Sequence, residues 1–132
     1  MADFTQIISF CESLHKNVTM ETPFGQQTIT PKIGNKIFCF ISLESEQPSI
    51  SIKGLPEDMA ALKETNSATF DARYLNKKHW TGIHINSDIS HIELQELIHT
   101  SFKLVAYSLT KKTQKELGLI PYKECIYKVC DS

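Results

Sequence analysis

Two runs of β-type residues, Gln27 to Ile33 and Lys36 to Leu43, are joined by only two residues, Gly34 and Asn35. Glycine and asparagine readily adopt the positive backbone dihedrals that a two-residue hairpin turn requires. A link this short forces antiparallel pairing, because a parallel pair needs a long crossover connection. The chain is therefore predicted to be built around an antiparallel hairpin.

Segments with helical or strand periodicity flank this hairpin on both sides. After it, Ser49 to Lys53 alternates as a half-buried strand does. Pro56 marks the first turn of a helix, a position where proline is tolerated. The predicted elements are a helix over residues 4–14, strands over 27–33, 36–43 and 49–53, a helix from residue 56, strands over 70–75 and 80–85, and a helix over 91–112.

The last helix has the clearest boundaries. Ser90-His91-Ile92-Glu93 matches a capping box, which satisfies backbone N–H groups at a helix start. Apolar residues continue along one face from Leu94 to Leu109, and Lys111-Lys112 follow, where the negative end of the helix dipole favours cations. One helix is therefore predicted from the capping box to this lysine pair.

The predicted order of elements is α-β-β-β-α-β-β-α. The fold class that suits it is α+β, an antiparallel β-sheet with helices on one face, which leaves the other face partly solvated. A length of 132 residues suits one domain. We assign residues 1–112 to this domain and predict that residues 113–132, where Gly118 and Pro121 interrupt any helix, form a C-terminal extension packing on the same domain.

Charge and composition narrow the classes of function. The net charge is -1, whereas a strong phosphate binder usually has a clear basic excess, so nucleic-acid binding would have to come from local patterning. The chain shows neither an apolar run of membrane-spanning length nor a signal-peptide pattern, so we expect a cytoplasmic protein with no membrane partner. The four cysteines lack C-x-x-C spacing and are expected to be small buried hydrophobes.

The stretch Leu75-Asn76-Lys77-Lys78-His79-Trp80 places two lysines, a histidine and the only tryptophan between two predicted strands. In one interpretation the lysines neutralise phosphates, and His79 or Trp80 stacks on a base. In the other, Asn76 forms the turn, the lysines are solvated and Trp80 packs across a strand end. The residues favour the structural interpretation, which does not exclude binding by the lysines.

A second basic stretch, residues 101–115, contains no acidic residue. Its lysines are Lys103, Lys111, Lys112 and Lys115. If its end lies near the lysines at 77 and 78, the two stretches form one positive patch, but the sequence does not give this distance. Alone, lysines at a helix C-terminus are explained by the dipole.

No sequence motif indicates a metal, cofactor or catalytic site. The chain lacks G-x-S-x-G, a P-loop and G-x-G-x-x-G. Its histidines form no ligand motif, and His91 and His99, eight residues apart on one helix, would lie roughly 12 Å apart. We therefore expect a non-enzymatic protein that has no cofactor or metal.

Several short segments, in this order and spacing, resemble the MmcQ/YjbR family of small bacterial and archaeal proteins. They are Pro23-Phe24-Gly25, the hairpin from Lys32 to Phe38, Lys53, Leu75 to Trp80, and Ser101 to Val105 leading to Leu109 and Lys111-Lys112. The resemblance covers residues 3–112. Thr22 and Thr110 depart from the family pattern, in which an aromatic residue and a proline often occupy these positions.

The resemblance implies an α+β fold related in shape to the frataxin-like (CyaY-like) fold, and DNA binding through a "double wing" of β-hairpins. The family's N-K-x-H-W signature falls on Asn76, Lys77, His79 and Trp80, and its final lysine pair falls on Lys111 and Lys112. In proteins with the frataxin-like fold, the resemblance implies that iron delivery is carried by a dense acidic ridge on the first helix and its neighbouring strand. Since the first helix here offers only Asp3 and Glu12, iron delivery is not expected.

Two functional hypotheses follow. In the first, a small, monomeric, non-enzymatic protein contacts the DNA backbone through the stretch 76–80 and the pair Lys111-Lys112, with further lysines on the hairpin and third strand contributing. These further lysines are Lys32, Lys36 and Lys53. In the second, the solvated sheet face around Phe38 and Phe40 binds a protein or a small ligand, and the stretch 75–80 is purely structural.

Overall fold

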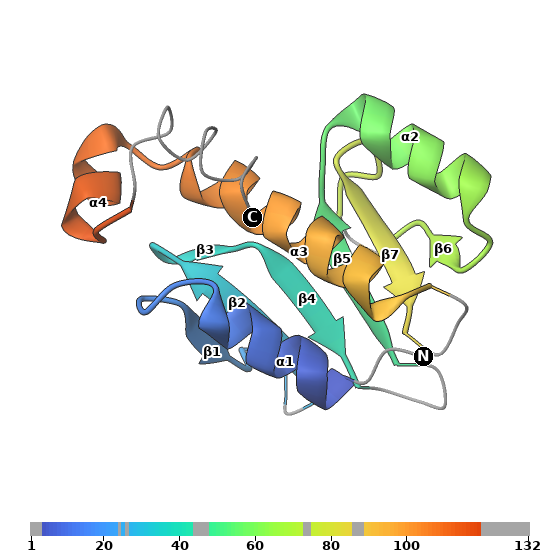
Figure 1. Cartoon of the computed structure of the whole chain (residues 1–132), viewed down its shortest axis with the longest axis horizontal. Coiled ribbons are helices and arrows are strands. Elements are labelled where there is room, and N and C mark those ends of the chain that lie inside the picture. Colours follow the sequence, from blue (N-terminus) through green and yellow to red (C-terminus); the bar gives the residue numbers. More distant parts are fainter. Residues whose placement is uncertain are drawn as a thin grey trace.

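The computed structural model describes residues 4–23, 25, 27–43, 48–72, 75–85 and 89–119. Its helices and strands are labelled in Figure 1. From the N-terminus onward they are α1 (Phe4–Ser13), β1 (Thr19–Glu21), β2 (Thr28–Ile33), β3 (Lys36–Ile37), β4 (Cys39–Ser42), β5 (Ser49–Lys53), α2 (Pro56–Thr65), β6 (Thr69–Phe70), β7 (Trp80–His84), α3 (His91–Ala106) and α4 (Lys111–Glu116).

The strands form one antiparallel sheet in the order β1-β2-β4-β5-β7-β6, with β3 paired to β2. Figure 1 shows α1 and α3 lying across the same face of this sheet, and α2 contacts β6 and β7. The predicted α+β class, an antiparallel sheet with helices on one face, is therefore confirmed. Among the helices that the structure describes, none is long and apolar enough to cross a membrane.

The central hairpin turns at Gly34 and Asn35, as the sequence predicts. Their φ angles are 59° and 67°, the positive values that a two-residue type I′ turn requires at both positions. The first helix and the strands Ser49–Lys53 and Trp80–His84 also lie where they are predicted.

A β-bulge divides the strand predicted over residues 36–43. Lys32 pairs with Ile37, but Ile29 pairs with Ile41, so the register shifts by one residue between them. At the shift, the Phe38 N–H donates to the Pro31 carbonyl oxygen over 3.1 Å. A bulge is also where a strand tolerates proline, which has no N–H to donate. Consequently two consecutive side chains, at positions 38 and 39, both enter the core and are fully buried.

Two short strands differ from the prediction. β1 was not predicted, because three residues at a sheet edge carry too little periodicity to detect; its Met20 pairs with Pro31 of β2. The strand predicted over residues 70–75 is shorter: β6 contains only Thr69 and Phe70, and residues 73 and 74 lie outside the described ranges.

Ser101 of α3 forms hydrogen bonds to the sheet at the bulge. Its Oγ accepts a hydrogen bond from the Lys53 N–H over 2.8 Å and donates a short one to the Phe38 carbonyl oxygen. The Phe38 ring packs edge-to-face on Phe102 of α3, with the ring centroids 5.3 Å apart. These contacts close a core whose fully buried members include Ile7, Ile33, Ile41, Ile50, Ile52, Ile83, Leu94 and Ile98.

The described cysteines confirm part of the cysteine prediction. Cys11 and Cys39 are both fully buried in this core. Burial raises the pKa of the Cys39 thiol well above its usual range, and the neighbouring Cys11 adds to the shift. Cys125 and Cys130 lie outside the described residues.

The prediction of one helix over residues 91–112 is wrong at its end. The start is confirmed, since the Ser90 Oγ accepts from the Glu93 N–H over 3.1 Å. However, α3 ends at Ala106, and Thr110 caps a separate helix, α4, by accepting from the Thr113 N–H over 3.1 Å. Lys111 and Lys112 therefore lie in the first turn of α4, where the helix dipole disfavours cations, and the dipole does not explain them.

The break after α3 allows the chain to pack on the hairpin turn. A Cβ on Gly34 would lie 2.7 Å from the Leu109 Cδ1 and 3.2 Å from the Leu117 Cδ1, so both leucines pack directly on the glycine of the turn. The Asn17 side chain donates to the Leu117 carbonyl oxygen over 2.7 Å. The division into residues 1–112 and 113–132 stays a prediction, although its boundary falls inside α4; residues 120–132 lie outside the described ranges.

Candidate nucleic-acid interface

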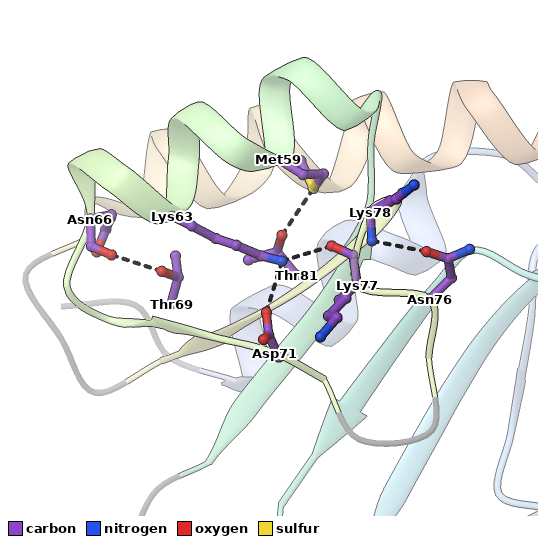
Figure 2. Close-up of polar contacts among 9 residues, drawn as sticks. All are labelled: Met59, Lys63, Asn66, Thr69, Asp71, Asn76, Lys77, Lys78 and Thr81. Atoms are coloured by element: carbon purple, nitrogen blue, oxygen red, sulfur yellow. Dashed lines mark hydrogen bonds and ion pairs between the residues drawn. The ribbon is translucent and has the colours of Figure 1, made fainter.

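The stretch 75–80 forms a hydrogen-bonded turn that leads into β7, and Asn76 organises it. The Asn76 carbonyl oxygen accepts from the N–H groups of His79 (3.1 Å) and Trp80 (2.9 Å). Its side-chain Oδ1 accepts from the Lys78 N–H over 2.9 Å, as Figure 2 shows. The His79 carbonyl oxygen accepts from the Gly54 N–H over 2.7 Å, which joins the turn to the end of β5. These contacts are those of a structural turn.

Lys63 of α2 holds the turn from the other side. Its Nζ donates to the Lys77 carbonyl oxygen over 2.7 Å and lies 2.8 Å from the Asp71 Oδ1 (Figure 2). The hydrogen bond from the Lys63 ammonium, together with its charge, holds the pKa of the Asp71 carboxyl below its ordinary value. The backbone of the turn is thus fixed by α2 as well as by its own residues.

The side chains of Lys77 and Lys78 remain available. Both are exposed, and neither forms an ion pair within the described part of the chain. In Figure 2 the two side chains diverge, one toward α2 and the other away from it. Ammonium groups that diverge in this way suit two separate phosphates rather than one. The structure therefore has the features of both interpretations of this stretch: an ordered turn that carries two exposed cations, of which Lys77 also acts electrostatically on the Asp71 carboxylate and lowers its pKa.

Trp80 begins β7 on the sheet face opposite the helices, which we term the open face. Its partner across the ladder is Lys53, and its ring meets Phe40 edge-on, with the ring centroids 5.5 Å apart. Because β5 lies between β4 and β7, these two strands are about 9.6 Å apart. The two rings must therefore lean toward each other over β5, which explains why Ser51 beneath them is only 9% exposed.

A second ring pair continues across the open face. Phe70 of β6 stacks on His84 of β7, with a centroid distance of 4.6 Å and an interplanar angle of 29°. The Phe70 ring also lies over Gly82, where a Cβ would come within 2.4 Å of it. The four half-buried rings of this face form a band across β4, β7 and β6, which we term the aromatic strip. Its members are Phe40, Phe70, Trp80 and His84.

Only part of this strip was predicted from the sequence. Trp80 was singled out, but Phe70 and His84 were not. The alternation of Trp80, Gly82 and His84 along one strand was the available signal, because residues two apart share a face. The hypothesis of a binding face around Phe38 and Phe40 is wrong for Phe38, which the bulge turns into the core; Phe40 does lie on the open face.

The structure does not bring the two predicted basic stretches together. Figure 1 places α4 and the start of β7 well apart along the long axis of the molecule. Around α4, the hairpin turn and the segment between α1 and β1 meet through the contacts of Leu109, Leu117 and Asn17. The exposed lysines on these converging segments are Lys16, Lys36, Lys111, Lys112 and Lys115. The molecule thus carries two separate basic groups, and the condition for a single patch is not met.

The remaining candidate lysines, Lys32 and Lys53, differ in their contacts and burial. Lys32 lies 3.4 Å from the Glu21 Oε1 across the β1–β2 pair. Lys53 is half-buried on the open face beside Trp80. Within the described ranges, no group of three or more histidine, cysteine, aspartate or glutamate side chains is arranged to hold a metal ion.

Comparison with known proteins gives consistent matches. The family model described as YjbR matches residues 14–104. The Escherichia coli O157:H7 protein named "Uncharacterized protein YbdF" is 33% identical over 95 residues, covering 72% of this chain and 78% of that protein. "Uncharacterized protein YjbR" of Escherichia coli K12 is 23% identical over 86 residues, covering 65% and 73%.

Solved structures agree on the fold. The crystal structure of Deinococcus radiodurans protein DR2400, described with the domain DUF419, superposes with a TM-score of 0.82 at 26% identity and covers 91% of both chains. A Pseudomonas syringae protein superposes with a TM-score of 0.69 at 18% identity, over 79% of this chain and 99% of that one, which supports the fold alone.

Proposed function

This protein belongs to the YjbR family, and we propose that it is a small, non-enzymatic, cytoplasmic protein that binds DNA through the phosphate backbone. Membership confirms the family resemblance found in the sequence. The DNA-binding proposal rests on that resemblance together with the geometry of the basic turn, defined as residues 76–79.

One observation carries the proposal: the basic turn has an ordered backbone and exposed cationic side chains. Asn76, Gly54 and Lys63 hold its backbone, whereas Lys77 and Lys78 are exposed and make no ion pair in the described ranges. A preorganised backbone lowers the entropy lost on binding. Two exposed ammonium groups that diverge from this backbone suit two separate phosphates of a nucleic acid.

Lys111 and Lys112 are assigned a secondary role. They lie in the other basic group, so they would contact DNA independently of the basic turn. Because the two basic groups are far apart, the losses of binding free energy caused by substitutions in each group should be additive.

The test is a titration of labelled DNA with wild-type protein and two double variants at several salt concentrations. Each phosphate contact contributes roughly 0.7 (single strand) to 0.9 (duplex) to the slope of log affinity against log salt. Lys77→Ala/Lys78→Ala is therefore expected to lower this slope by roughly 1.4 to 1.8. Lys111→Ala/Lys112→Ala removes the same charge elsewhere and should have the smaller effect.

The control double variant makes the result decisive. Equal losses in the two double variants would mean that overall charge sets the affinity, which would contradict the assignment to the basic turn. An unchanged affinity in Lys77→Ala/Lys78→Ala would contradict it as well.

A further inference from the structure

The aromatic strip begins where the basic turn ends. Trp80 is the first residue of β7, directly after the turn, and its ladder partner Lys53 extends onto the same open face. From Trp80 the strip reaches Phe40 over β5 and continues along β7 to the Phe70–His84 pair. The open face therefore carries a cation, Lys53, beside the first ring of a band of half-buried rings, and the basic turn adjoins the same end of the band.

We propose that the aromatic strip stacks unpaired bases, so that the DNA bound by this protein is single-stranded. This inference rests on the proposed function, because it assigns the phosphates of the same strand to the basic turn. Base–aromatic stacking accepts every base, since each has a π-face, and changes affinity by about 5- to 150-fold per base.

The arrangement of the rings supports stacking. Phe40 and Trp80 meet at 67° and Phe70 and His84 at 29°, so each pair fixes the orientation of its rings before a ligand arrives. The rings are half-buried, so part of each ring is open to solvent. Ser51 and Gly82 lie beneath the rings, and their small size lets the rings lie close to the sheet.

Charge complementarity selects nucleic acid as the occupant. Lys53, Lys77 and Lys78 lie at the end of the strip where Trp80 begins. Among the described strand residues of the open face, the acidic one is Glu21, and Lys32 already pairs with it. On the described strands, the open face therefore has rings and positive charge, and it has no unpaired carboxylate that would repel a phosphate.

The rings also discriminate between the two forms of DNA. In a duplex the base faces are stacked on each other, so side chains reach only base edges and phosphates. Rings lying on a sheet face would gain nothing from a duplex. Unpaired bases can instead be splayed onto such a face, as they are on other aromatic sheet surfaces.

The experiment compares a labelled 12-nucleotide thymidine strand, an RNA strand of the same length, and a DNA duplex of the same length. Each is titrated with wild type, Phe40→Leu, Lys77→Ala/Lys78→Ala and Tyr107→Leu, the last an aromatic change at the end of α3 on the helix side of the sheet. Trp80, the single tryptophan, reports stacking in the wild-type protein through quenching of its fluorescence. Thermal melting confirms that each variant is folded at the assay temperature.

We expect the single strand to bind more tightly than the duplex and to quench Trp80. Phe40→Leu should weaken single-strand binding about 5-fold or more without changing its salt slope, whereas Tyr107→Leu should leave it unchanged. The quenching measurement needs no variant, so a folding defect in Phe40→Leu does not decide the outcome.

Three results would overturn the inference, each in a recognisable way. If duplex and single strand bound equally, Trp80 were not quenched and Phe40→Leu had no effect, the rings would have no stacking role. If Lys77→Ala/Lys78→Ala still lowered the salt slope in that case, the proposed function would stand without the stacking. Absence of binding to every nucleic acid at low salt would remove both. Tighter binding of the RNA strand than of the DNA strand would overturn the assignment to DNA.

Discussion

At the residue scale, Gly82 shows how one missing side chain shapes the open face of the sheet. A Cβ built on Gly82 lies 2.4 Å from the Phe70 ring, and ring atoms cannot yield as the end of a flexible chain can. Gly82→Ala should displace Phe70 from His84 and lower the free energy of unfolding by about 1–3 kcal/mol, the range for an overpacked site. Urea denaturation measures this loss.

Ser49→Ala is the matched control for Gly82→Ala, since Ser49 lies on the same face of neighbouring β5. Its expected effect is about 0.5 kcal/mol or less. If Gly82→Ala were equally mild, the close approach of Phe70 to the strand would not be a feature of the folded protein.

Asp71 makes the attachment of the basic turn sensitive to pH. Lys63 depresses the folded-state pKa of Asp71, so the ionised pair contributes stability above the ordinary value of 3.8, and this contribution is lost as pH falls through the lower folded-state pKa. Asp71→Asn should therefore be less stable than wild type at neutral pH, and the difference should vanish in acid. Thermal melting at several pH values tests this, and a difference that persisted at low pH would argue against the ion pair as its cause.

At the element scale, Ser101 connects α3 to two strands at the point where the ladder is interrupted. Ser101→Ala would leave the Phe38 carbonyl oxygen and the Lys53 N–H without their partner in a buried region. The expected cost is about 1–3 kcal/mol of unfolding free energy, the range for buried polar groups left unpaired.

Ser108→Ala serves as the control, because Ser108 is exposed and its hydroxyl donates only locally, to the Val105 carbonyl oxygen. Chemical denaturation of both variants should separate them clearly. Similar losses would mean that the bridge at the bulge contributes nothing beyond an ordinary helix-surface hydroxyl.

The same elements show what local sequence can and cannot predict. The turn at Gly34 and Asn35 and the cap at Ser90 depend on the chemistry of a few adjacent residues, and both were predicted. The bulge at Phe38 is bonded to Ser101, far along the chain, and strand periodicity does not show its position. After the early end of α3, Leu109 packs on Gly34, a contact between distant segments that helical periodicity cannot anticipate.

At the scale of the whole molecule, a net charge of -1 conceals two separate basic groups. The sequence identified most lysines of the two groups but not Lys16, and the separation of the groups depends on how α3, α4 and the sheet are arranged (Figure 1). The aromatic strip likewise combines residues from three strands, and only the fold brings them together. Single residues of the candidate site were therefore predictable, whereas its extent was not.

The most direct test of the account is the perturbation of backbone amide chemical shifts by NMR as short single-stranded DNA is added to wild-type protein. The account predicts perturbations concentrated in residues 76–80, at Lys53 and along the strands that carry the aromatic strip, with small changes on α4. Perturbations confined to α4 and the hairpin turn, or none at all, would contradict the assignment of DNA binding to the basic turn.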